Sequence, residues 1–351
     1  MWQIVNRTPF EAGQGWIRDR NGAEVWLVAV KATFDVLPDG STEVSKLQPP
    51  VLRVPEHYGE PGKSSIKYES DFVLTKKTTD IIFSGHAYAP NARPVRELAI
   101  RFQVGPVDKS LRVFGDRKWG GFGLSDPQPF VKMPIIYERA YGGVDTKSEN
   151  PERDWEWRNP IGTGYSAKKG HTTDLRLPNI EHPGELIGSW KDRPAPAGFG
   201  PIASHWQPRA SFAGTYDGKW ESTRQPLLPE DFDDRFFQCA PPDQQSPQFL
   251  KGGEHVVLLN LSQSARIEFL LPNFSLELKT HFMDGERRVH AAPRLHTVIL
   301  EPDFPRVSLV WHSAIECHSK VYQLENTRIE WRTDAMDEDA DESVESLLDL
   351  I

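Results

Sequence analysis

Residues Glu24 to Val36 read EVWLVAVKATFDV, a run rich in the β-branched and aromatic residues that favour strands. The pair Asn21-Gly22 comes just before this run, and Pro38-Asp39-Gly40 follows it. Because Asn-Gly is typical of a two-residue hairpin turn, we expect Trp16 to Arg20 to be the partner strand. The sequence therefore predicts an antiparallel β-hairpin near its start.

Short apolar runs of the same kind recur on both sides of a different central segment. Asp80 to Tyr88 is one, and Val95 to Val104 is another, in which apolar and charged residues alternate. After residue 253 the expected strands are Glu254 to Leu261, Ala265 to Leu271, Phe274 to Thr280, Leu295 to Leu300 and Val307 to Trp311. Gly, Pro, Asn or Asp separates them, which predicts a mainly β protein with an antiparallel β-sandwich or barrel-like scaffold.

Helix is expected to be the minority state. One short helix is predicted at Pro229 to Cys239, with Asp231 as the cap of its first turn. Three of its residues would share one side of that helix, namely Phe232, Phe236 and Phe237.

Residues 116–253 differ from both flanks. They hold 16 of the 29 Pro, 16 of the 26 Gly and 6 of the 11 Trp, with few strand patterns. A flexible linker would not carry so many aromatic residues, so we expect ordered loops packed on the scaffold. The predicted organisation is an N-terminal β region at 1–115, a loop-rich aromatic middle segment at 116–253, a C-terminal β region at 254–333 and a disordered acidic tail at 334–351.

Charge and composition exclude several classes of function. The formal net charge is -9 and the basic residues are scattered, so direct binding of nucleic acid is not expected. Val25 to Val30 and similar apolar runs are far shorter than the ~20 residues of a membrane span. Met1 to Phe10 lacks the apolar pattern of a secretory signal, so we expect a cytoplasmic protein. Cys239 and Cys317 are expected to be reduced, buried thiols.

Motifs of nucleophilic, nucleotide and metal chemistry do not stand out. The sequence contains neither G-x-S-x-G nor a phosphate-binding P-loop nor a complete G-x-G-x-x-G, so no cofactor is expected. The pairs His290/His296 and His312/His318 lack the spacing of a zinc motif, and no metal site is predicted. An offset of six on a strand does place both members of a pair on one face, which leaves a weak surface site as the alternative.

Two interpretations remain open for the acidic residues of the middle segment, Asp116, Glu138, Asp231, Asp233 and Asp234. The favoured one is that each pairs with an adjacent or nearby Arg and so ties down a loop. In the alternative, Glu138 faces one of the three later acids across a cleft, and the protein is a carbohydrate-active hydrolase that uses paired carboxylates.

We expect a protein that binds other proteins and is not an enzyme. Candidate contact residues in the middle segment are Trp119, Tyr137, Arg139, Tyr141, Trp206, Arg209, Tyr216, Trp220, Phe232 and Arg235. Aromatic and Arg side chains dominate interface hot spots, but aromatics also fill cores, and the sequence does not separate the two sets. In the tail, Leu347, Leu348 and Ile351 continue from Val344 at a helical spacing that suits contact in a groove; a solvated tail is the alternative.

Short motifs in a defined order cover about residues 5 to 260. They are NRTPF at 6–10, VKATF at 30–34, KTTD at 77–80, GHAYAP at 85–90, GDRKW at 115–119, MP at 133–134, YERAYGG at 137–143, NPIG at 159–162, LPNIE at 177–181, GFGP at 198–201, WQPR at 206–209, GTYD at 214–217 and PEDFDDRF at 229–236. With them the chain resembles the effector adaptor (chaperone) proteins of bacterial type VI secretion, a former domain-of-unknown-function family encoded beside VgrG, PAAR and effector genes. The resemblance implies a cytoplasmic protein, without catalytic residues or cofactor, that binds a cognate type VI effector and promotes its loading onto the VgrG spike or its PAAR tip.

Overall fold

The structure is a computed structural model that describes residues 2–120 and 123–332. The chain is mainly β, as predicted, and most strands belong to sheets of four, five and six strands. The six-stranded sheet has the order β2-β3-β22-β21-β7, with β4 paired to β3. Its strands are β2 (Glu11–Arg18), β3 (Glu24–Val36), β22 (Arg306–Glu316), β21 (Arg294–Glu301), β7 (Asp80–Phe83) and β4 (Thr42–Val44).

Strand β3 lies inside the six-stranded sheet, between β2 and β22, and is buried on both faces, which explains why its sequence is almost continuously apolar. It pairs with β2 in an antiparallel ladder that places Trp26 opposite Trp16. The connecting turn has Gly22 at φ 86°, a conformation that glycine adopts without strain. The predicted hairpin is therefore confirmed, although its first strand is Glu11–Arg18 and not Trp16 to Arg20.

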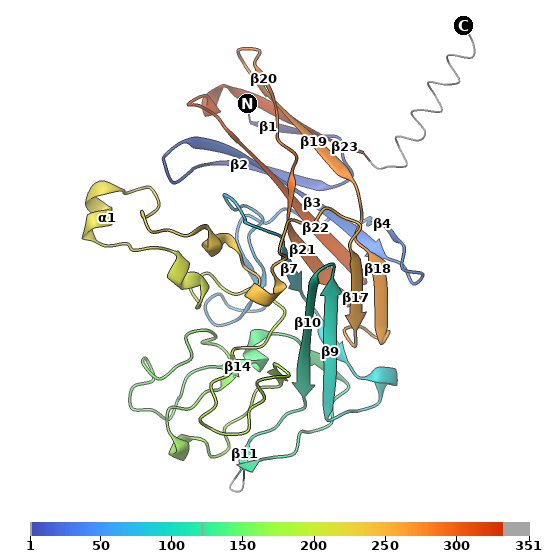
Figure 1. Ribbon diagram of the computed structural model, residues 1–351, viewed down its shortest axis with the longest axis vertical. Coiled ribbons are helices and arrows are strands. Elements are labelled where there is room, and N and C mark those ends of the chain that lie inside the picture. Colours follow the sequence, from blue (N-terminus) through green and yellow to red (C-terminus); the bar gives the residue numbers. More distant parts are fainter. Residues whose placement is uncertain (1, 121–122, 333–351) are drawn as a thin grey trace.

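The four-stranded sheet covers one face of the six-stranded sheet (Figure 1). Its order is β1-β23-β19-β20, with bounds β1 (Gln3–Asn6), β23 (Leu324–Arg332), β19 (Ser275–Phe282) and β20 (Arg287–Val289). Phe10, Phe34 and Phe274 lie between the two sheets, with ring centroids 5.1 to 5.7 Å apart. Each such buried side chain contributes about 1.5–3 kcal/mol, so this aromatic layer holds the two sheets together.

The five-stranded sheet extends the same core toward the lower end of Figure 1. Its order is β16-β10-β9-β17-β18, with bounds β16 (Ile180–Glu181), β10 (Val107–Phe114), β9 (Glu97–Val104), β17 (His255–Leu259) and β18 (Arg266–Leu270). Phe102 of β9 packs edge-on against Phe199 of the middle segment, with ring centroids 4.8 Å apart. This contact joins the middle segment to the scaffold.

Pairing differs from a purely antiparallel scaffold in two places. β7 runs parallel to β21, and β1 runs parallel to β23. Both pairs join strands from opposite ends of the chain, which supplies the long connection that a parallel pair requires. The single strand expected at Asp80 to Tyr88 is divided, because β7 pairs with β21 whereas β8 (His86–Tyr88) pairs with β13 (Lys132–Pro134). Across residues 2–120 and 123–332, no sheet closes into a barrel.

The helix predicted at Pro229 to Cys239 is wrong. That stretch contains only a 3-10 turn, Asp234–Phe237, because the Asp233 side chain accepts a hydrogen bond from the Arg235 N–H and starts the turn late. The three phenylalanines predicted to share a side do lie together, with ring centroids 5.3 to 6.0 Å apart. The α-helix found in the described ranges is α1 (Gly218–Thr223), capped by Asp217.

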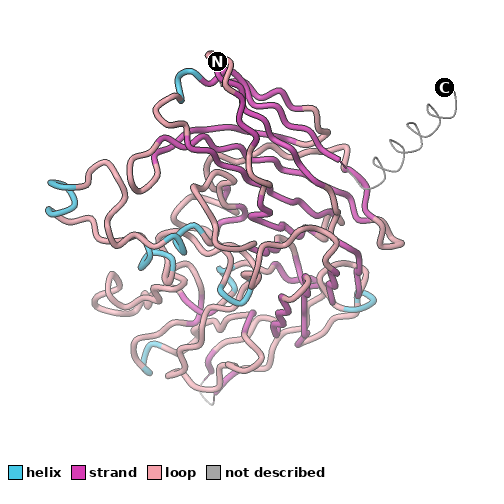
Figure 2. Tube along the Cα trace, turned by 45° about the horizontal axis from the view of Figure 1, so that its top comes forward, coloured by secondary structure: helices cyan, strands magenta, loops and turns pink. Residues whose placement is uncertain are grey.

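Between β10 and β17 the chain consists mostly of loops (Figure 2). The remaining short strands are β5 (Glu56–His57), β6 (Ile66–Tyr68), β11 (Trp119–Gly120), β12 (Gly123–Leu124), β14 (Tyr141–Gly142) and β15 (Thr163–Gly164). The other 3-10 turns are Pro90–Ala92, Tyr137–Arg139, Lys169–His171, Arg209–Phe212, Pro242–Gln244 and Val321–Gln323. No helix in the described part of the chain has the length and hydropathy to span a membrane.

Candidate functional site

Most aromatic residues predicted for an interface lie inside the middle segment. Trp206 and Tyr137 meet edge to face, with ring centroids 5.7 Å apart and exposed fractions of 1% and 3%. Trp119 and Tyr141 are buried in a second cluster, and Phe232 is buried as well. These five side chains pack the loops, so a partner cannot contact them directly.

Arg209 and Arg139, which were predicted to contact a partner protein, also hold loops in place. Arg209 is buried, and it donates from Nη1 to Glu69 Oε2 at 2.5 Å and from Nε to the Phe236 carbonyl at 3.0 Å. Arg139 is partly buried and donates from Nη1 to Asn179 Oδ1 at 2.9 Å. Hydrogen bonds from a charged guanidinium are directional, so they fix the geometry of the segments they join.

Residues of three short motifs, GDRKW, YERAYGG and LPNIE, line one surface pocket. A fourth motif, NPIG, packs against YERAYGG. The pocket has a volume of ≈ 300 Å³, and its walls include Asp116, Arg117, Glu138, Arg139, Leu177 and Asn179. Behind it Gly143 has φ 92°, and a Cβ there would lie 2.4 Å from the Gly162 carbonyl oxygen. Only glycine fits this approach, so close packing of the loops accounts for Gly143 in the YERAYGG motif.

The prediction that each of the five acidic residues pairs with a nearby arginine holds for Asp116 and Asp233 alone among the described ion pairs, and the partner is not always the adjacent arginine. Asp233 does pair with Arg235, at 2.7 Å, as expected. Asp116 pairs with Arg139 at 3.4 Å and not with the adjacent Arg117. Adjacent side chains often point apart, which is why neighbours in sequence predict such pairs poorly.

The carboxylates proposed for hydrolysis have other partners. Glu138 accepts hydrogen bonds from Ser65, from N–H at 2.8 Å and from the hydroxyl at 2.7 Å. Asp231 accepts from the N–H and hydroxyl of Thr215 at 2.9 and 2.7 Å, and these bonds lower its pKa. The two acids line separate pockets, so this pair does not share a cleft.

The histidines do not contact one another in the pairs His290/His296 and His312/His318 that their spacing suggested. The ring of His290 bonds to the hydroxyls of Thr280 and Ser313 at 2.7 and 2.8 Å. His296 stacks on His312, with ring centroids 4.6 Å apart. Burial lowers the pKa of His290 and of His312 to about 4. Within residues 2–120 and 123–332, no three His, Cys, Asp or Glu side chains group as metal ligands.

One part of the middle segment projects from the rest, and we call its residues 213–231 the arm (left side of Figure 1). Inside the arm, Trp220 Nε1 donates to the Leu227 carbonyl at 2.8 Å. Arg224 Nη2 donates to the carbonyl of Arg20, beside the β2–β3 turn, at 2.6 Å. The arm is therefore fixed internally and tied to the scaffold hairpin.

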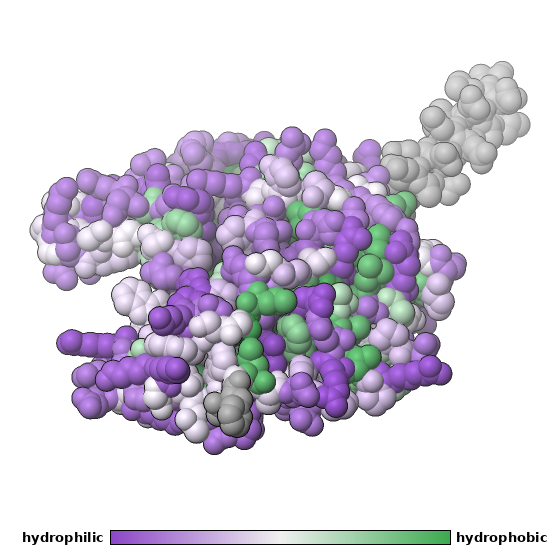
Figure 3. All heavy atoms as spheres, turned by 60° about the horizontal axis from the view of Figure 1, so that its bottom comes forward, coloured by the Kyte–Doolittle hydropathy of each residue, from purple (hydrophilic) through white to green (hydrophobic). Residues whose placement is uncertain are grey.

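The arm presents aromatic and charged side chains to solvent. Tyr216 is 53% exposed and packs edge-on against Trp220, with ring centroids 4.7 Å apart. Helix α1 has no buried residue. A pocket of ≈ 270 Å³ opens beside the rings, with walls that include Thr215, Asp217, Lys219, Trp220, Arg224 and Glu230. Figure 3 shows the projection from the lower end of the molecule, with polar and near-neutral residues mixed on its surface. Aromatic anchors with Arg and a polar rim are typical of protein interfaces.

Arg235, the remaining candidate of the middle segment, is exposed near the base of the arm. Its guanidinium lies over the Phe212 ring, 4.2 Å from the centroid. Its Nε and Nη2 already bond to Asp233, at 2.9 and 2.7 Å, so only the rest of the stacked guanidinium can contribute to the same surface. The tail candidates Leu347, Leu348 and Ile351 lie outside the described residues.

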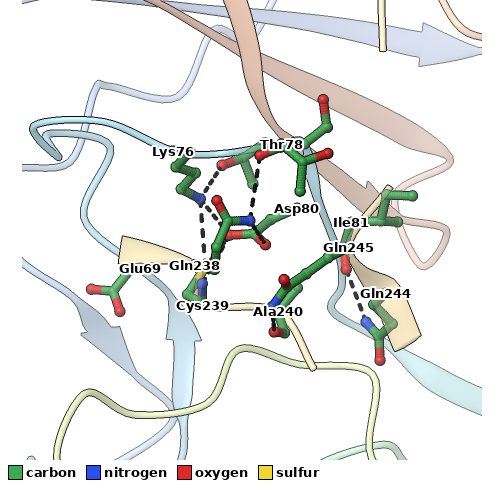
Figure 4. A network of polar contacts seen from close by, with 12 residues as sticks. Glu69, Lys76, Thr78, Asp80, Ile81, Gln238, Cys239, Ala240, Gln244 and Gln245 are labelled. Carbon is green, nitrogen blue, oxygen red and sulfur yellow. Dashed lines mark hydrogen bonds and ion pairs between the residues drawn. The ribbon is translucent and has the colours of Figure 1, made fainter. Parts of the chain in front are cut away.

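A buried polar network fastens the end of the middle segment to β7 (Figure 4). Lys76 Nζ lies 2.6 Å from Asp80 Oδ2 and donates to Thr297 Oγ1 at 3.0 Å. Asp80 also accepts from Gln238 Nε2 and from the Cys239 N–H, both at 2.8 Å. Burial raises the pKa of the Cys239 thiol, so it stays protonated, and the prediction of a buried, reduced thiol is confirmed.

Sequence reasoning selected the two arm aromatics but missed the charged residues around them, Lys219, Arg224 and Glu230. The sequence does carry a pattern that indicates helix α1, because Asp217 precedes Trp220 by three positions, which is the spacing of an N-cap. The network around Asp80 was also missed, since its members are far apart in the chain.

A family model described as "Uncharacterized protein conserved in bacteria (DUF2169)" matches residues 21–312. This range includes β3, the arm and the strands β21 and most of β22. No curated protein and no solved structure matches the chain.

Proposed function

The chain belongs to the DUF2169 family of proteins conserved in bacteria, and from this premise we propose that it is an adaptor of type VI secretion. In this role it binds a cognate effector in the cytoplasm and promotes loading of that effector onto the VgrG spike or its PAAR tip. Support for the secretion role comes from the ordered motifs between NRTPF and PEDFDDRF. Support for binding comes from the arm.

The observation that carries the proposal is a pair of packed rings on a fixed arm, of which Tyr216 is exposed and Trp220 is half-buried. Tyr216 is 53% exposed, while the indole N–H of neighbouring Trp220 is already satisfied within the arm. A surface that is held in shape before binding loses little conformational entropy when a partner arrives. Large aromatic side chains then bury much area per immobilised residue.

The arm is not required to cover the main core. Residues of the apolar core come from the three large sheets and from segments such as Ala197 and Phe199, and none comes from the arm. Because the arm projects from the molecule, its rings are left partly open to solvent. This arrangement favours an interaction surface.

The buried motif residues have a different role in the proposal. Tyr137, Trp206 and Arg209 shape the loops from which the arm starts, and they do not meet the partner. Substituting them would report on folding and not on recognition. A test of binding must therefore change an exposed ring of the arm and not one of these buried residues.

The test is a reconstitution with purified proteins. The full chain is mixed with the effector encoded by the neighbouring gene and, separately, with VgrG, and complexes are separated by size-exclusion chromatography. We expect a stable complex with the effector. If neither the effector nor VgrG is retained by the folded wild-type chain, the proposal is wrong.

A matched pair of variants locates the surface. Tyr216→Ala should weaken effector binding by roughly 10-fold or more, the scale of a hot-spot residue. Trp157→Ala is the control, because Trp157 is also a middle-segment aromatic residue with a similar exposed fraction, 59%, but it lies outside the arm. Equal affinities for the two variants would place the binding surface elsewhere.

A further inference from the structure

An apolar groove lies between the start of β19 in the four-stranded sheet and the start of β21 in the six-stranded sheet. It has a volume of ≈ 790 Å³, and its walls include Phe249, Phe274, Leu276, Leu295 and Trp311. Leu276, Leu295 and Trp311 lie on β19, β21 and β22, whereas Phe274 and Phe249 lie in the loops before β19 and β17. The volume falls within the range of roughly 300–1,000 Å³ found for sites that enclose a ligand or a few side chains.

The described chain ends at the wall of this groove. Arg332, the last residue of β23, pairs with Ser275 of β19, and Ser275 lines the groove. The preceding residue, Trp331, packs edge-on against Phe274, with ring centroids 6.3 Å apart. Residues 333–351 therefore begin beside the apolar surface.

The sequence of the tail is suited to an apolar groove with a basic rim. Residues 333–351 contain eight Asp and Glu and no Lys or Arg. Its apolar residues recur at the spacing of one face of a helix, namely at Val344, Leu347, Leu348 and Ile351. A groove that accepts this stripe needs apolar walls and positive charge at its edge.

The groove has both properties. Lys251 and Arg294 lie in its lining, and neither forms an ion pair with another described side chain between residues 2 and 332. Arg294 lies over the Phe249 ring, 5.1 Å from the centroid, so its charge is held at the groove's edge. Positive charge at the groove's edge orients an incoming acidic segment more than it strengthens the binding of that segment.

Chain length permits docking within one molecule. Residues 333–343 separate the groove wall from the apolar stripe, and a chain of that length spans roughly 15–20 Å when flexible. Because the linker starts at the groove, the stripe is held near it at an effective concentration of about millimolar. A weak contact is therefore populated without any partner.

We infer that residues 344–351 of the tail occupy this groove in the same molecule, with Leu347 and Leu348 against its apolar walls and the acidic residues toward Lys251 and Arg294. The tail thereby covers apolar surface on the scaffold that would otherwise be open to solvent. This inference does not depend on the role of the arm.

The test is disulfide trapping with two exposed alanines. Ala292 lies in the groove lining, whereas Ala265 lies in the turn before β18 and serves as the control. Each is changed to Cys in a full chain that also carries Leu348→Cys, and the native thiols, which are both buried, do not compete. Under mild oxidation the Ala292→Cys pair should close within the molecule about tenfold faster than the Ala265→Cys pair.

Adding Leu347→Asp to the Ala292→Cys pair should reduce its rate to that of the control. Equal rates for the two cysteine pairs would overturn the inference. So would a crosslink that forms only between two chains and speeds up with protein concentration.

A second measurement avoids substitutions in the tail. A fluorescent peptide of sequence VESLLDLI should bind a protein that ends at residue 343, and Ala292→Trp should abolish this binding while Ala265→Trp preserves it. Absence of peptide binding to the shortened protein would contradict the inference.

Discussion

The scaffold and the middle segment are stabilised in different ways. The three large sheets share one continuous apolar core, supported by regular backbone ladders. Among its described residues the middle segment has two small apolar clusters of its own, around Trp206 and Tyr141, and it also relies on side-chain hydrogen bonds to backbone and on buried ion pairs. A ladder distributes its stability over many residues, whereas a polar network concentrates it in a few.

This difference suggests how the molecule separates folding from recognition. The scaffold tolerates modest changes because each residue contributes a small share of the core. The middle segment depends on particular side chains to hold an irregular shape, and the arm projects from that shape. Four predictions test the comparison.

The largest expected effect comes from the buried network. Lys76→Met leaves the Asp80 carboxylate buried without its cation, which should cost about 3–5 kcal/mol of unfolding free energy. In the scaffold, Ile100→Val should cost only about 0.5–1.5 kcal/mol. Urea unfolding measures both, and similar losses for the two variants would contradict the contrast.

A glycine of the loop motifs gives the next largest effect. Gly143→Ala introduces a Cβ at a positive φ and against a carbonyl, and it should destabilise the protein by about 1–3 kcal/mol. Gly184 is the control, because a Cβ at that position meets no atom within 4 Å. If Gly184→Ala lowers the melting temperature as much, close packing does not explain the motif.

Acid should weaken the β21–β22 region through its buried histidines. The pKa of His290 and of His312 is lowered to about 4 by burial, so between pH 6.5 and 4 the unfolded chain binds protons that the folded chain does not. Stability is then complete above pH 6.5 and falls with pH, by up to about 1.4 kcal/mol per pH unit for each histidine. His290→Gln should flatten the stability curve in that window; an unchanged slope would disprove the assignment.

The smallest effect on stability is expected in the arm. Tyr216→Ala should change the unfolding free energy by no more than about 0.5 kcal/mol, because the side chain is mostly exposed. The same variant should clearly weaken effector binding. A large loss of stability would show that the ring belongs to the core and not to a binding surface.

The parts of the fold that follow from local patterns were predictable. The alternation in β9 and the Asn21-Gly22 turn specify their strands within a few residues, so both agree with the structure. The parallel pairing of β7 with β21 was not predictable, because it joins residues far apart in the chain. Composition set the aromatic middle segment apart from its flanks but could not show that Trp206 is buried and Tyr216 exposed, since both depend on how the loops pack.

Hydrogen exchange of the full chain, with and without bound effector, tests the account most directly. We predict that amides of the arm, residues 213–231, become protected when effector binds, while the loop around Trp157 and the strands of the scaffold change little. Protection confined to the scaffold sheets, with the arm unchanged, would contradict the proposal that the arm is the recognition surface.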